Sequence, residues 1–197
     1  MLMNVVGLLG WAATWLGLLY VLIAYLSPSF SFLFALPLCY CFYRAVVQLR
    51  YFSPALQMRR ILRTYPWRII RGVPHGLADH AEVSHKHYGW FEFSNPAHPE
   101  CRLPLVFSRH HRTEWWHRRM APRAKPMLKA EIEMIWFAGD PRFVGLIAAS
   151  GRDGITPCRL HILEQRMASQ DSERFREWGA TAEDVERGRR AGISSHP

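Results

Sequence analysis

The first fifty residues contain two long apolar runs separated by a short break. The run from Asn4 to Leu26, NVVGLLGWAATWLGLLYVLIAYL, carries no charge. As an α-helix it would extend over roughly 30 to 35 Å, enough to cross the hydrocarbon core of a bilayer. After SPSFS, the run from Phe32 to Leu49 has Arg44 as its single charge and suffices for a second crossing, with a kink or stagger expected at Pro37. So short a loop requires antiparallel helices, and we predict a transmembrane hairpin over residues 1–50.

The first run differs from a cleavable signal peptide. No basic region precedes it, and its apolar core is longer than the roughly 7 to 15 residues of such peptides. We therefore expect this helix to be retained. Small residues on one side of it, Gly10, Ala13 and Gly17, would let another helix approach closely. That helix is either the second helix of the hairpin or the same helix of another copy in a homo-oligomer.

From Trp67 the pattern changes to short β-branched or aromatic runs. Turn residues separate them, as in NPAHPE, GDP and SGRDG, which supply the Asn, Asp, Gly and Pro of tight turns. Several short antiparallel strands in one compact region predict a mainly-β domain over residues 66–166, a small barrel or sandwich, with an open-edged sheet as the alternative. The predicted strands are 67–73, 87–93, 103–108, 131–138, 142–150 and 158–164.

The tail from 167 to 197 is polar and mixed in charge. Thr181 and Asp184 have the spacing of a capping box and predict a short helix after them. We expect either a loosely docked helix pair or a disordered segment, with a mobile end at GRRAGISSHP.

The net charge of +9 is concentrated near the hairpin. No charged residue precedes Arg44, and seven arginines occur before the first acidic residue, Asp79. The remaining charged residues, 18 basic and 16 acidic, are nearly balanced. Basic residues beside spanning helices stay in the cytoplasm, so we predict a multi-pass protein of the cell membrane with both termini and the β domain cytoplasmic. The four scattered cysteines suit a reducing compartment. The arginines that precede the first acid, Asp79, are Arg44, Arg50, Arg59, Arg60, Arg63, Arg68 and Arg71.

Residues 51–65 predict a basic juxtamembrane amphipathic helix, with Ser53 as N-cap and Pro54 as its first residue. It would rest on the inner membrane surface, where arginines attract anionic lipid. The alternative is a linker helix packed on the following domain. The predicted apolar stripe is Ala55, Met58, Leu62 and Tyr65, and the predicted lipid contacts are Arg59, Arg60 and Arg63.

The stretch RHHRTEWWHRR, from 109 to 119, combines four arginines, three histidines and two tryptophans. Arginine with tryptophan suits the inner leaflet, because arginine attracts anionic lipid and tryptophan settles at headgroup depth. It also suits nucleic acid, although no domain-wide basic surface supports that partner. A structural loop with a buried tryptophan is the third interpretation. The candidate lipid or phosphate contacts are Arg109, Arg112, Trp115, Trp116, Arg118 and Arg119.

Histidines also cluster between the first two predicted strands. His85 and His87 would share a face of an extended chain, as two ligands of one metal ion require. With His75 and His80 they form a candidate metal site, but the spacing of these four histidines matches no recognised metal-binding motif. The sequence contains no GxSxG, P-loop, GxGxxG or HExxH motif, and we assign no catalytic residue and no cofactor.

The segment WFAGDPRFVGLIA, Trp136 to Ala148, resembles a segment of small, arginine-rich integral membrane proteins of high-GC bacteria, whose role is uncharacterised. The 22 arginines against three lysines are compatible with such a source. The resemblance implies a membrane location and assigns no activity.

Taken together, these patterns favour a non-enzymatic integral membrane anchor or scaffold. Its cytoplasmic β domain would dock an unknown protein partner at the inner leaflet of a bilayer rich in anionic lipid. The alternative is a metal-dependent enzyme or metal-binding module that uses the cluster from His75 to His87.

Overall fold

The computed structural model describes residues 2–25, 32–77, 89–107, 113–151, 153–165 and 172–193. The chain divides into two compact units, Met1–Gln57 and Met58–Pro197. The boundary falls inside helix α3 (Phe52–Thr64), so that the last turns of this helix belong to the second unit.

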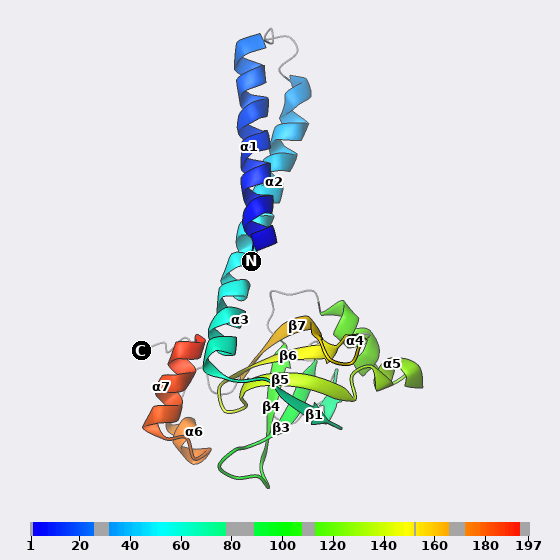
Figure 1. Ribbon diagram of the computed structural model, residues 1–197, viewed down its shortest axis with the longest axis vertical. Coiled ribbons are helices and arrows are strands. Elements are labelled where there is room, and N and C mark those ends of the chain that lie inside the picture. Colours follow the sequence, from blue (N-terminus) through cyan, green and yellow to red (C-terminus); the bar gives the residue numbers. More distant parts are fainter. Residues whose placement is uncertain are drawn as a thin grey trace. The chain divides into compact units, whose positions relative to one another are not determined.

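The first unit contains the two long helices α1 (Leu2–Tyr25) and α2 (Ala35–Arg50), which lie side by side (Figure 1). The contact is aromatic: the ring centroids of Trp11 and Tyr40 are 5.6 Å apart, and the Arg44 guanidinium lies over the Trp11 ring at 5.3 Å. Pro37 lies in the first turn of α2, where a missing N–H leaves no intrahelical bond unmade. The predicted helical hairpin is therefore present.

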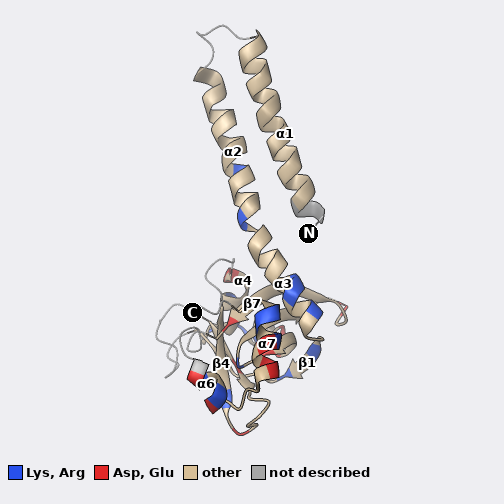
Figure 2. Ribbon diagram, turned by 90° about the vertical axis from the view of Figure 1, so that its left-hand side faces the viewer, with Lys and Arg blue, Asp and Glu red and all other residues tan. Residues whose placement is uncertain are grey.

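Both helices of this unit carry exposed apolar side chains on their outer faces. Ile23 and Leu36 are each 82 % exposed, and Figure 2 shows α1 without a charged residue. The helical segments Val5–Tyr25 and Phe32–Thr64 are long and apolar enough to cross a membrane.

The small-residue side of α1 faces away from α2. A Cβ atom added at Gly10 or Gly17 would meet no atom within 4 Å, whereas one at Gly7 would lie 2.9 Å from the Gln48 Nε2. The prediction that α2 packs on Gly10, Ala13 and Gly17 is therefore wrong. The large rings of α2 pack on the tryptophan side of α1 instead, where close backbone approach is not needed. A homo-oligomer formed through this seam stays a prediction.

Helix α3 begins at Phe52, so Ser53 and Pro54 lie inside its first turn and Ser53 is not the N-cap. In the second unit, Ile61 is fully buried and Tyr65, just after the helix, is 9 % exposed, while Leu62 is 36 % exposed. The predicted apolar stripe is thus wrong at Leu62. The end of α3 packs its apolar side on the β domain, which agrees with the alternative of a linker helix packed on the domain that follows it.

The β domain contains one antiparallel sheet with two open edges, curled into a half-barrel (Figure 1). The strand order is β1-β5-β6-β7-β4-β3-β2. All six predicted strands are present with shifted ends, and a further short edge strand, β2, begins at His75, between the first two predicted strands. The sheet is neither a closed barrel nor a two-sheet sandwich, so the open-edged alternative holds. The strands are β1 (Arg68–Arg71), β2 (His75–Gly76), β3 (Trp90–Ser94), β4 (Arg102–Phe107), β5 (Met134–Asp140), β6 (Val144–Ser150) and β7 (Pro157–Glu164).

Both faces of the central strands are buried, each against different helices. On one face an aromatic cluster that includes Phe91, Phe107 and Phe137 packs against Trp116 of α4 (Glu114–Met120). The short helix α5 (Pro126–Ala130) follows α4. On the other face, Leu146 and Ile162 pack with residues of α3 and of the C-terminal helices. Alternation along β6 and β7 sends neighbouring residues to opposite faces, which explains their nearly continuous apolar sequence.

The C-terminal tail forms two helices, α6 (Ser172–Glu177) and α7 (Ala182–Ala191). The predicted capping box is confirmed: the Asp184 backbone N–H donates to the Thr181 hydroxyl, and the Thr181 N–H donates to the Asp184 carboxylate. The prediction of a mobile end from residue 188 is wrong as far as Ile193, because Gly188 and Ala191 are buried against the domain. Residues 194–197 lie outside the described part.

Candidate functional site

A buried ion network attaches α7 to the sheet. Arg142, in the turn between β5 and β6, is 4 % exposed and forms two hydrogen bonds of 3.0 and 2.7 Å from its Nε and Nη2 to the Asp140 carboxylate. Its Nη2 also lies 3.1 Å from an Asp184 oxygen of α7, and its Nη1 donates to the Gly179 carbonyl at 3.1 Å. One guanidinium therefore joins the turn, α7 and the loop before α7, which fixes the position of that helix on the domain.

Tyr65 ends the α3 segment beside this network. Its hydroxyl is buried and has no hydrogen-bond partner among the described residues. Burial, with a further contribution from the negative charge of Asp140, raises the pKa of Tyr65 to about 12. Asp184 has the opposite shift: burial alone would raise its pKa, but hydrogen bonds from Thr181 and the charge of Arg142 lower it overall.

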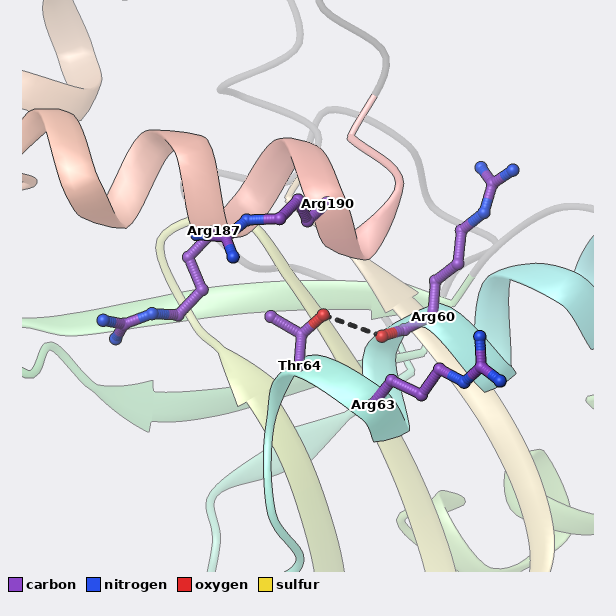
Figure 3. A pocket seen from close by; sticks show the side chains of 5 residues that line it. All are labelled: Arg60, Arg63, Thr64, Arg187 and Arg190. Carbon is purple, nitrogen blue, oxygen red and sulfur yellow. Dashed lines mark hydrogen bonds between the residues drawn. The ribbon is translucent and has the colours of Figure 1, made fainter.

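Next to the network, α3 and α7 line a cleft of about 420 Å³. We call it the α3–α7 cleft. Figure 3 shows Arg60 and Arg63 extending from α3, Arg187 and Arg190 extending from α7, and Thr64 between them. The Thr64 hydroxyl donates to the Arg60 carbonyl at 2.8 Å. Segments more than 100 residues apart in the sequence thus contribute four arginines to the lining of one cleft, whose volume is typical of small-ligand sites.

Three of these four cations have no acidic partner among the described residues. Arg187 pairs with Glu183 at 2.7 Å and approaches Asp184 at 3.8 Å, whereas no ion pair is found there for Arg60, Arg63 or Arg190. A guanidinium group offers N–H donors and a permanent positive charge and accepts no proton. The lining of the cleft therefore has the chemistry of anion binding, with phosphate and carboxylate as the groups that arginine recognises best.

The structure assigns different roles to the residues of 109–119 that were predicted to contact lipid or phosphate. Trp116 is 1 % exposed and its indole N–H donates to the Arg159 carbonyl, so its assignment as a lipid contact is wrong, and it is a core residue. Arg119 pairs with Glu131 at 2.7 Å and lies 3.7 Å above the Trp115 ring. The side chains of Arg119 and Trp115 are therefore both engaged in contacts within the domain. Arg118 is exposed. Arg109 and Arg112 lie outside the described residues.

Of the predicted metal ligands, only His75 lies in the described part. Its Nδ1 is 2.9 Å from the Val73 carbonyl oxygen, and its ring packs on Phe91. Within the described ranges, no group of three or more His, Cys, Asp or Glu side chains could hold a metal ion. His80, His85 and His87 lie outside those ranges, so the metal site stays a prediction.

The sequence contains a local signal for part of the ion network but none for the cleft. The segment GDPR predicts a tight turn, and an Asp and an Arg two residues apart between apolar strands are also candidates for a buried ion pair. Arg187 and Arg190 belong to the segment that the sequence predicts as a polar tail, and they line one cleft with Arg60 and Arg63 only because of how α7 packs. The spacing of these residues along the sequence does not predict that arrangement.

No protein-family model matches the chain, and no curated protein or solved structure matches it either. The resemblance of Trp136 to Ala148 to small bacterial membrane proteins therefore stays a sequence-based expectation. In the structure this segment is the hairpin of β5 and β6, with the Asp140 to Arg142 turn at its tip.

Proposed function

We propose that the chain is a non-enzymatic integral membrane anchor whose β domain docks a protein partner at the inner leaflet. The observation that carries the proposal is the first unit, in which two long helices present exposed apolar side chains on their outer faces. In water such a surface would be costly, since each large side chain that leaves water contributes about 1.5 to 3 kcal/mol. A bilayer supplies the apolar surroundings that these side chains need.

The charge distribution supports the orientation in which both termini are cytoplasmic. No charged residue precedes Arg44, while Arg50 and the arginines of α3 follow the second helix closely. Positive residues near the ends of spanning helices are retained in the cytoplasm.

Chain connectivity supports contact between the domain and the leaflet. Only nine residues separate Arg50 from Arg60, so the arginines of α3 cannot be far from the end of the second apolar run. Arg59, Arg60 and Arg63 are exposed. Their attraction to anionic lipid, on the order of 1 kcal/mol each near the surface, would hold the domain against the headgroups.

The anchor is tested by expressing the full chain with different epitope tags at its two ends. We expect a single membrane-bound species of full mass that carries both tags and resists extraction with alkaline carbonate. Loss of the N-terminal tag from the membrane species would show that the first helix is a cleaved signal sequence. Release of both tags by carbonate would show that the helices do not span the bilayer.

The scaffold role is tested separately by mild detergent extraction followed by affinity purification of the full chain. We expect a protein partner to co-purify in a constant ratio to the anchor. If the pure chain is recovered alone after crosslinking in intact cells, the scaffold role is wrong, while the anchor result is unaffected.

A further inference from the structure

The arginines of the α3–α7 cleft are held on a rigid base although their side chains reach solvent. Ile61 and Tyr65 anchor α3 in the core, and the network of Arg142 with Asp140 and Asp184 anchors α7. The Cα positions of the lining residues are therefore fixed by buried contacts. A site whose backbone is fixed in this way loses less conformational freedom on binding than one on loops.

The lining of the cleft carries four positive charges. Arg60, Arg63 and Arg190 line one depression without an acidic partner among the described residues, and Arg187 adds a fourth guanidinium that is shared with Glu183 and Asp184. Like charges gathered near a protein surface repel one another, and a multivalent anion removes this repulsion more effectively than a monovalent one.

The chemistry of the donors favours phosphate. The arginines of both walls carry paired N–H donors on long, rotatable side chains, and turning these side chains into the cleft would direct the donors to the oxygens of one phosphate. A phosphate monoester carries nearly two negative charges at pH 7, because its second pKa is about 6. A lipid phosphodiester carries one charge and has two of its oxygens esterified.

We propose that the α3–α7 cleft is a binding site for a doubly charged phosphate group. The proposal deepens the membrane anchor function and rests on it only for the source of the ligand. At the inner leaflet the group would be the phosphate monoester of an anionic lipid headgroup. A soluble phosphate compound has the same chemistry, and the experiment separates the two sources.

Binding is measured with the full chain in neutral detergent micelles. Pyrophosphate is titrated calorimetrically, and lipid binding is measured by native mass spectrometry with phosphatidic acid, a monoester, against phosphatidylglycerol, a diester, at matched negative charge. We expect saturable binding of pyrophosphate and stronger binding of phosphatidic acid than of phosphatidylglycerol. If pyrophosphate binds and phosphatidic acid does not, the site stands and its ligand is soluble. Detectable and equal binding of both lipids, or no binding of pyrophosphate, overturns the proposal.

Three variants separate a site from general electrostatic attraction. Arg63→Gln with Arg190→Gln removes one arginine from each wall of the cleft and should weaken pyrophosphate binding about tenfold or more, because charge-assisted hydrogen bonds are lost. The matched control, Arg71→Gln with Arg189→Gln, removes the same charge outside the lining and should change affinity less than about twofold. Equal weakening by both pairs contradicts the proposal.

The third variant, Thr64→Phe, keeps all four arginines and fills the cleft between them. It should abolish binding, whereas a charge effect without a site would leave binding unchanged. Thermal unfolding of each variant shows whether the fold is intact, and the double Gln variant alters only exposed side chains. None of these measurements depends on membrane orientation, so failure here leaves the anchor test valid, and failure of the anchor test leaves the cleft assignment valid.

Discussion

At the scale of single residues, the Tyr65 hydroxyl is a buried polar group without a partner in the described part of the chain. Such a group contributes a desolvation cost and no compensating bond. Tyr65→Phe should therefore leave the unfolding free energy unchanged or raise it by about 1 kcal/mol. Tyr51→Phe, which alters an exposed side chain, is the control. A clear loss of stability in Tyr65→Phe would mean that the hydroxyl has a partner, and denaturant unfolding of the full chain in micelles measures the difference.

The Tyr65→Phe substitution should also change how the free energy of unfolding depends on pH. The folded-state pKa of Tyr65, about 12, lies above its ordinary value of 10.0, so the folded protein holds this proton more tightly than the unfolded chain. Its contribution is complete below pH 10 and is lost as the pH rises from about 10 towards 12. The Tyr65→Phe variant should lose less stability than the wild type in this window.

The network around Arg142 predicts an acid dependence. The pKa of Asp184 is lowered in the folded state, so its contribution to stability is present above the unfolded pKa near 4 and is lost as the pH falls through the folded value. Asp184→Asn should lower the unfolding free energy by about 1 to 3 kcal/mol at pH 7, because charged hydrogen bonds to Arg142 and Thr181 are weakened. The difference from wild type should shrink below pH 4. A difference that stays constant from pH 7 to pH 3 would contradict this role of the charge.

At the scale of elements, α4 offers two adjacent arginines with opposite roles. The Arg119 side chain is 12 % exposed, pairs with Glu131, the residue directly after α5, and lies over the Trp115 ring, whereas Arg118 is exposed. Arg119→Ala should cost about 1 to 2 kcal/mol through the lost ion pair and cation–π contact, and lower the melting temperature by a few degrees. Arg118→Ala should change stability by less than about 0.5 kcal/mol. Equal melting temperatures for the two variants would show that the Arg119 contacts do not stabilise the domain.

The elements differ in how far sequence pattern could predict them. Strand positions and the α7 cap follow from local rules, because alternation, turn residues and the Thr181 to Asp184 spacing are properties of short segments. The choice of Ile61 over Leu62 as the buried residue of α3 depends on which side the sheet approaches. The α3–α7 cleft and the contact between Arg142 and Asp184 form only when distant segments pack, so no local pattern specifies them.

At the scale of the whole molecule, the charge asymmetry makes a prediction about orientation that is independent of the cleft. The first charged residue, Arg44, lies in the C-terminal part of the second apolar run, and no acid appears until Asp79, so every charge near the hairpin is positive and lies in or after the end of that run. We expect both ends of the chain in the cytoplasm, since an even number of crossings returns the chain to its starting side.

A reporter enzyme that is active only outside the membrane, fused after Pro197, should be inactive, and a reporter that works only in the cytoplasm should be active there. Exchanging Arg44 and Arg50 for Gln weakens the positive flank of the second run, and we expect a measurable fraction of inverted molecules because this flank sets the orientation. Arg68→Gln with Arg71→Gln removes the same charge from the edge strand β1 and should invert fewer molecules. Activity of the external reporter in the unmodified chain would reverse the orientation and place the arginines of α3 on the outer side of the membrane.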